Sequence, residues 1–158
     1  MDTKEIIVGI DLGTTNSEVA AFYEDNCKVI GPEQGPRMLP SCVGISPCGA
    51  FFVGEKARNQ LLLYPELTAE SVKRKMGTDE KLSLGKEQYS PEEISALILR
   101  ELVQWASVKL GGPVKKAVIT VPAYFSDIQR EATRHAGELA DLEVVRILNE
   151  PTAASLAY

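Results

Sequence analysis

Metal centres, disulfide frameworks and polyanion-binding surfaces need residue types that this sequence has little of. Its 3 cysteines, Cys27, Cys42 and Cys48, form no CxxC pair and are odd in number, so we expect reduced thiols in a cytosolic protein. Its 1 histidine, His135, has no partner at ligand spacing, which argues against a metal site built around it.

Basic charge and long apolar runs are also missing. The formal net charge is -5, whereas binders of nucleic acid or anionic membranes gather a basic excess on one face. No apolar run approaches the roughly 20 residues that span a bilayer, and the acidic start at residues 1–5 lacks the basic character of a secretory signal. We therefore expect a cytoplasmic protein, with no nucleic acid and no membrane among its partners.

The composition that is present is ordinary for a soluble globular protein. With 158 residues, 44% of them hydrophobic and 25% charged, the chain is about one average domain and long enough to bury a core.

The amino-terminal part predicts three strands in a meander. Residues 6–10 form an apolar run, interrupted only by Gly9, which predicts a strand buried on both faces. Residues 17–23 alternate along a second strand. Residues 27–30 follow a tight turn at Asp25-Asn26, so short turns rather than crossover helices join the three segments.

The middle of the chain has a different pattern of predicted elements, with short strands and long helices. Short strands are expected near residues 41–46 and 50–53, followed by a helix at residues 55–64 that Pro65 stops. We interpret residues 40–112 as an inserted α+β subdomain.

Two helix starts carry complete capping boxes. Ser90 and Glu93, with a proline at the first helical position, predict a helix over residues 91–110. Ser126 and Gln129 open a second helix in the same way.

The end of the chain predicts two strand-turn-helix units. Residues 117–121 and 144–148 are apolar runs typical of buried strands, and the second leads into a helix at 149–151. Together with the meander they predict an α/β protein with a mixed five-strand sheet flanked by helices, whose core subdomain comprises residues 1–39 and 113–158. The five strands would carry Ile6, Val19, Val29, Val118 and Val145.

The turn after the first strand has the chemistry of an anion-binding loop. In residues 9–17, Gly13 lets the backbone approach a ligand closely and take a φ that another residue would resist. Backbone N–H groups and threonine hydroxyls there can converge on an anion. Asp11 would repel a phosphate unless a divalent cation lay between them, and Mg²⁺ with its water shell is the natural bridge. An ordinary hairpin is the structural alternative, since the loop is neither a Walker A nor a GxGxxG motif.

Two further segments place charged residues where a ligand or a helix end would use them. Glu150 lies where a strand meets a helix, a place where ligand sites gather in α/β folds, although simple helix capping explains it at least as well. Residues 72–77 hold three successive cations, which usually form a solvated helix face. The functional reading is that one lysine among them stabilises charge on a γ-phosphate.

In combination these motifs resemble the seventy-kilodalton heat-shock chaperone family, DnaK and its relatives. Six segments match in order, and the resemblance runs from residue 6 to the last residue. They are residues 9–17 (GIDLGTTNS), 54–57 (GEKA), 72–74 (VKR), 89–96 (YSPEEISA), 117–125 (AVITVPAYF) and 149–154 (NEPTAA).

The resemblance implies the first lobe of an actin-like (ribonuclease H-like) ATPase domain that uses Mg²⁺ with ATP or ADP. Asp11 would bind the water shell of the metal, Lys73 would hold the attacking water and the γ-phosphate, and Glu150 would contact the same network. Pro122 and Arg130 would relay the nucleotide state to a substrate domain. Four residues would wrap the phosphates: Gly13, Thr14, Thr15 and Asn16.

The resemblance also implies the partners of a longer protein. Its ATP cycle would drive binding and release of unfolded or hydrophobic polypeptides, helped by a J-domain co-chaperone and a nucleotide-exchange factor. The second phosphate loop and the adenosine pocket of the family do not occur in these 158 residues. We therefore expect no ATPase activity from this chain alone and ATP binding no tighter than about 1 mM.

Two other functions stay open at this point. A sugar kinase of the same fold would need a catalytic acid and sugar-binding groups, and residues 89–93 and 149–151 argue against it. An actin-like filament or scaffold module would associate through an exposed apolar patch, and none is evident in the sequence.

Overall fold

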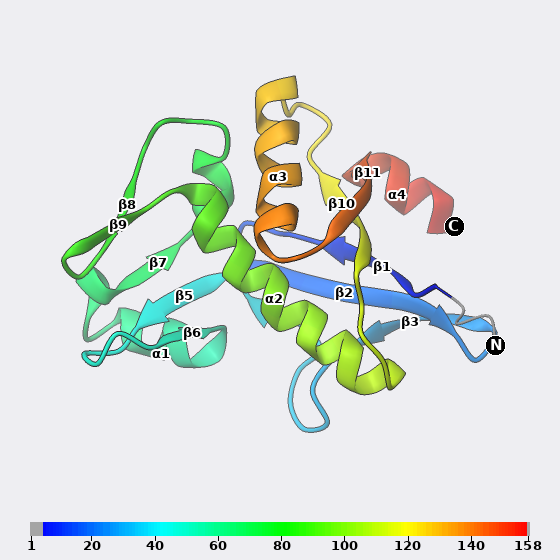
Figure 1. Cartoon of the computed structure of the whole chain (residues 1–158), viewed down its shortest axis with the longest axis horizontal. Helices are drawn as coiled ribbons and strands as arrows, with labels where there is room; N and C mark the ends of the chain where they lie inside the picture. Colours follow the sequence, from blue (N-terminus) through cyan, green and yellow to red (C-terminus); the bar gives the residue numbers. More distant parts are fainter. Residues whose placement is uncertain (1–4, 158) are drawn as a thin grey trace.

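A mixed sheet forms the centre of the computed structural model, which describes residues 5–157 (Figure 1). The acidic start at residues 1–4 and the last residue of the predicted core subdomain lie outside this range. The strands are β1 (Ile7–Asp11), β2 (Asn16–Tyr23), β3 (Asn26–Ile30), β4 (Leu39–Pro40), β10 (Lys116–Val121) and β11 (Glu143–Asn149).

The strand order confirms the predicted mixed sheet. The order is β11-β10-β1-β2-β3, with β1, β10 and β11 parallel and β1, β2 and β3 an antiparallel meander. Ile6 lies one residue before β1, and the short strand β4 pairs with β2 as an unpredicted sixth member. The turn between β2 and β3 is one residue earlier than predicted, because Glu24 and Asp25 are the residues with positive φ.

The prediction that the first strand is buried on both faces is wrong. In β1 the side chains of Val8 and Ile10 are buried, whereas Ile7 is 45% exposed. Strand β10 likewise buries mainly one face, and in β11 only Val144 is buried. Helices α2 (Pro91–Leu110) and α3 (Asp127–Leu139) lie across one face of the sheet (Figure 1), while α4 (Glu150–Ala157) packs against the β10–β11 end of the sheet.

The two capped helices form as predicted, because their start signals are local. Ser90 accepts from the backbone N–H of Glu93 at 3.1 Å, and the Glu93 carboxylate accepts from the Ser90 N–H at 2.7 Å. Ser126 and Gln129 make the same reciprocal pair at the start of α3. Each closed box satisfies two backbone donors that a helix end otherwise leaves unpaired.

The middle of the chain contains more strands than predicted. The three-stranded sheet β6-β5-β7 joins β5 (Cys42–Ile45), β6 (Phe51–Val53) and the unpredicted β7 (Thr68–Glu70). The hairpin of β8 (Leu82–Leu84) and β9 (Glu87–Tyr89) was also missed, since strands of three residues carry little periodicity.

The predicted helix at residues 55–64 is shorter in the structure. Helix α1 ends at Leu61, and Pro65 begins a 3-10 helix at Pro65–Leu67 instead of simply stopping α1. One apolar cluster runs from the central sheet through α2 to Val43 and Leu84. The division into a core and an inserted subdomain stays a prediction.

Candidate functional site

The candidate site lies at the carboxyl edge of the three parallel strands. Asp11 ends β1 and pairs with Thr120 of β10, while Asn149 ends β11 opposite Val121. Parallel strands end on the same edge, where ligands gather in open α/β sheets. This edge therefore brings together Asp11, the turn after β10 and the start of α4.

A buried pair of serines anchors the loop between β1 and β2. The Ser17 hydroxyl accepts from the Gly13 N–H at 3.1 Å and lies 2.8 Å from the Ser41 hydroxyl. The Ser41 N–H in turn donates to the Thr15 carbonyl at 2.8 Å. Both serine side chains are buried, so these polar contacts are costly to lose and hold the loop in one conformation.

Gly13 is required by a close contact inside the loop rather than by an unusual φ. A Cβ atom at this position would lie 1.9 Å from the Asn16 carbonyl oxygen, and Gly13 is absent from the residues with positive φ. The expectation of an unusual φ at Gly13 is therefore wrong, and its close approach to a ligand stays a prediction. The group that approaches Gly13 here is the loop's own carbonyl.

The loop leaves part of its backbone donors for a ligand. The Gly13 N–H is used by Ser17, but within residues 5–157 no acceptor takes the N–H of Thr14 or Thr15. Thr15 is exposed and Thr14 is half-buried. Two adjacent unpaired N–H groups at a turn favour an anion.

Asp11 presents an exposed carboxylate beside this loop. One of its oxygens accepts from the Thr120 hydroxyl at 2.9 Å. No group of three or more His, Cys, Asp and Glu side chains in the described part of the chain would enclose a metal. A metal at Asp11 would therefore need water and phosphate oxygens for most of its coordination, which suits Mg²⁺.

Lys73 and Glu150 meet across the site. The Lys73 Nζ lies 2.6 Å from the Glu150 Oε1, with side chains 8% and 39% exposed, and 5.8 Å from the centroid of the Phe125 ring. Lys73 belongs to a 3-10 helix at Val72–Lys75, where Arg74 is exposed. The interpretation of this run as a solvated face holds for Arg74 and is wrong for Lys73.

Arg130 is also more enclosed than its helical position suggests. Its guanidinium donates to the carbonyls of Phe125 at 3.2 Å and Ala123 at 3.4 Å, and to the Asn149 Oδ1 at 2.7 Å. Pro122, buried at the end of β10, accepts from the Phe125 N–H at 3.1 Å. Arg130 thus ties the turn after β10 to the end of β11, and the interpretation of Arg130 as a solvated helix residue is wrong.

Three participants escaped the sequence reasoning: Ser41, Thr120 and Phe125. Thr120 and Phe125 lie inside a quoted motif and Ser41 begins a predicted strand, yet each has a partner distant in the chain, as with the 109 positions between Thr120 and Asp11. Strand register could have found Thr120, because it is the residue opposite Asp11.

An exposed apolar run follows α1, contrary to the sequence analysis. Leu62, Leu63 and Tyr64 are 89%, 75% and 51% exposed.

No helix among residues 5–157 combines the length and apolar character needed to cross a bilayer.

The sheet and its edge define an α/β protein with a glycine-containing loop at the carboxyl ends of parallel strands. The Hsp70 protein family model matches residues 7–83 and 78–158. The chain is 54% identical over 158 residues to the chaperone protein DnaK of Thermotoga neapolitana, covering 99% of this chain and 26% of that protein. It is 55% identical over 156 residues to the DnaK of Thermosipho africanus, covering 98% and 26%.

The chain therefore belongs to the Hsp70 family. It spans about a quarter of the length of these relatives, 26% in each case. The predicted family and its mixed α/β fold with flanking helices are confirmed.

Proposed function

We propose that this chain forms the phosphate- and metal-facing wall of the ATPase domain of a DnaK-like chaperone. The observation that carries the proposal is the convergence on one sheet edge of the Gly13–Asn16 loop, Asp11 and the Lys73–Glu150 pair. Three segments far apart in the sequence thus supply anion donors, a metal-facing carboxylate and a buried ammonium.

The loop and Asp11 would divide the binding of Mg-ATP between them. The N–H groups of Thr14 and Thr15, with the side chains of Thr14, Thr15 and Asn16, are donors for phosphate oxygens. Asp11 would hold the water shell of Mg²⁺, and the metal would neutralise charge on the phosphates. The Thr120 hydroxyl keeps the Asp11 carboxylate oriented.

Lys73 and Glu150 would act on the attacking water and the γ-phosphate. The ammonium of Lys73 is held over the Phe125 ring and carries its charge in a mostly buried place, where electrostatic stabilisation is stronger than in water. A γ-phosphate would compete with Glu150 for this ammonium. The released carboxylate would then accept a hydrogen bond from water.

Pro122 and Arg130 would transmit the state of the site. Arg130 holds the turn after β10 to Asn149, the neighbour of Glu150. A change in the Lys73–Glu150 pair would therefore reach this turn through adjacent residues. This connection is the basis on which we propose a relay to a substrate domain.

The longer protein would couple ATP hydrolysis to binding and release of unfolded polypeptides in the cytoplasm. A J-domain co-chaperone and a nucleotide-exchange factor would be its partners. Residues 1–39 with 113–158 would form the core subdomain, and residues 40–112 the inserted one.

Titration of the 158-residue chain with Mg-ATP, followed by calorimetry and amide NMR, tests the site. This wall offers the phosphates a few donors from one loop, most of them exposed, and exposed charge-assisted contacts are screened, so we expect a Kd no tighter than about 1 mM. At high concentration, amide shifts should concentrate on residues 11–16 and Glu150. Shifts centred elsewhere would remove the assignment, and a micromolar Kd would show that this wall binds nucleotide unaided.

A further inference from the structure

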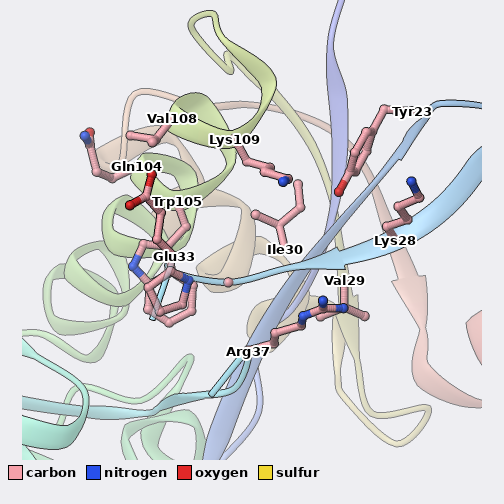
Figure 2. Close-up of a pocket in the computed structure, with 12 residues that line it drawn as sticks. Tyr23, Lys28, Val29, Ile30, Glu33, Arg37, Gln104, Trp105, Val108 and Lys109 are labelled. Atoms are coloured by element: carbon pink, nitrogen blue, oxygen red, sulfur yellow. The ribbon is translucent and has the colours of Figure 1, made fainter. Parts of the chain in front are cut away.

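A cavity of about 670 Å³ lies between the carboxyl half of α2 and β3, the last strand of the sheet (Figure 2). None of the residues proposed for phosphate or metal binding lines it. Its volume falls within the roughly 300–1,000 Å³ typical of small-molecule sites. The cavity is therefore a separate candidate site.

One part of the lining is aromatic and apolar. Trp105 and Val108 come from α2, while Tyr23 and Ile30 come from the sheet. Trp105 is half-buried, and its Nε1–H donates to the Glu101 Oε1 at 2.9 Å. Because the polar edge of the indole is satisfied within its own helix, the ring is left for stacking or apolar contact.

The charged part of the lining is mostly cationic. Lys28, Arg37 and Lys109 line the cavity together with one carboxylate, that of Glu33, although the whole chain has a net charge of -5. Lys28 is paired with Glu24.

The other two cations lack such a partner. Among residues 5–157 neither Arg37 nor Lys109 has a carboxylate within ion-pair distance. Figure 2 shows Lys109 extending from α2 toward Ile30 of β3, and Arg37 beside Val29 across the β3 ribbon from Lys109. Two cations without an ion-pair partner therefore line the same cavity, and Glu33 is the one carboxylate in that lining.

The position of Arg37 is set by close packing of the loop after β3. A Cβ atom at Gly31 would lie 2.8 Å from both the Cα and the Cγ of Arg37. The loop thus folds back tightly on the end of β3. This contact places the Arg37 side chain at the cavity before any ligand arrives.

We propose that this cavity binds a small planar aromatic anion. The guanidinium of Arg37 presents a fork of donors suited to a carboxylate, sulfonate or phosphate, and Lys109 adds a second positive charge. The aromatic body of the ligand lies against Trp105 and Val108. The proposal is independent of the ATPase function, since the two sites share no residue.

The test uses 8-anilinonaphthalene-1-sulfonate as the probe and Trp105, the only tryptophan among the 158 residues, as the reporter. We expect saturable energy transfer from Trp105 to the bound dye. Arg37→Gln and Lys109→Gln should each weaken the dye by about tenfold, because each removes one charged contact. Lys86→Gln, which removes an exposed lysine outside the cavity, is the matched control and should leave the affinity unchanged.

Two further arms identify the position and the chemistry of binding. N-phenyl-1-naphthylamine, the uncharged analogue, should bind more weakly, so at equal concentration it should accept much less energy from Trp105. Leu63→Ser tests whether the dye instead sits on the exposed run after α1. The proposal is overturned if Arg37→Gln and Lys109→Gln bind like the parent, if the uncharged analogue binds equally well, or if Leu63→Ser abolishes the transfer.

Discussion

The ammonium of Lys73 lies 2.6 Å from a carboxylate oxygen of Glu150, although the two residues are 77 positions apart in the chain. The pair joins the 3-10 helix at Val72–Lys75 to the start of α4. It brings two separately predicted site residues into one contact and places both beside the turn after β10.

Lys73→Ala should slow ATP hydrolysis in the full ATPase while leaving nucleotide affinity largely intact. Positioning a water and stabilising developing charge act mainly in the transition state. Single-turnover rates and equilibrium binding measured on the same variant separate the two effects. Lys75→Ala is the matched control, because Lys75 lies on the same 3-10 helix and pairs with Glu80 away from Glu150. Equal loss of affinity and rate in Lys73→Ala would assign it to ground-state binding instead.

Asp11→Asn should reduce ATP turnover far more than it reduces fold stability. The amide keeps an oxygen that can accept from Thr120, so the local structure survives, but it loses the charge that faces the metal shell. Turnover and thermal unfolding of the same preparations are the measurements. Asp141→Asn, an exposed carboxylate at a left-handed position that asparagine also tolerates, is the control. Unchanged turnover in Asp11→Asn would end the metal-shell assignment.

Ser41→Ala should loosen the phosphate loop without altering any residue of the loop itself. Loss of the Ser41 hydroxyl frees the Ser17 rotamer, and the Gly13 N–H loses a fixed acceptor. We expect hydrogen exchange at the Gly13 amide to accelerate by about tenfold, equivalent to roughly 1.4 kcal/mol.

Ser95→Ala provides the comparison for this loop experiment. Ser95 is equally buried, but its hydroxyl contacts the Met76 Sδ at 3.5 Å, away from the loop. It should leave Gly13 exchange unchanged. The same acceleration in both variants would mean that the serine pair has no specific role in holding the loop.

Gly13→Ala should destabilise the chain by about 1–3 kcal/mol, because the new methyl group collides with the Asn16 carbonyl. Gly112→Ala is the control, since its Cβ would meet only Ile6 Cδ1 at 3.9 Å. Urea unfolding of both variants measures the difference. Similar midpoints for the two would show that the loop relaxes around a side chain without cost.

The cysteines should differ sharply in their reactivity with thiol reagents. Burial raises the pKa of the Cys42 thiol to about 11, so Cys42 stays protonated and inaccessible at neutral pH. The Ser46 hydroxyl lowers the pKa of the exposed Cys48 thiol, which should therefore react at lower pH than a free cysteine. Mass spectrometry after labelling between pH 6 and pH 9 (roughly the range around the ordinary thiol pKa) would show this order. Labelling of Cys42 in the folded chain would contradict its burial.

The Cys42 shift also makes a signed statement about stability. The pKa of the Cys42 thiol is about 11 in the folded state, whereas the ordinary pKa of a thiol is 9.0. Above the lower value the unfolded state binds fewer protons, so the free energy of unfolding should fall as pH rises through this window.

Local chemistry in the sequence was enough to predict α2 to its terminal residues, both capping boxes, the family motifs and the five principal sheet strands. Capping boxes close within four residues, and a strand of five or more residues shows its period in its own side chains. Short strands such as β7, β8 and β9 carry too little of either signal. The polarity of the two sheet faces was missed for another reason. An apolar run such as residues 6–10 looks the same whether helices cover one face or both.

Only the tertiary structure decided which polar groups meet. Local sequence does not predict that Lys73 is buried or that Arg130 donates to Asn149. Nor does it predict that Ser17 accepts from the Gly13 N–H and contacts Ser41. Side-chain charge and hydrogen-bonding capacity are written in the sequence, but their strength depends on burial and partners. Burial and partners are decided only by folding, which brings segments many residues apart together at one edge of a sheet.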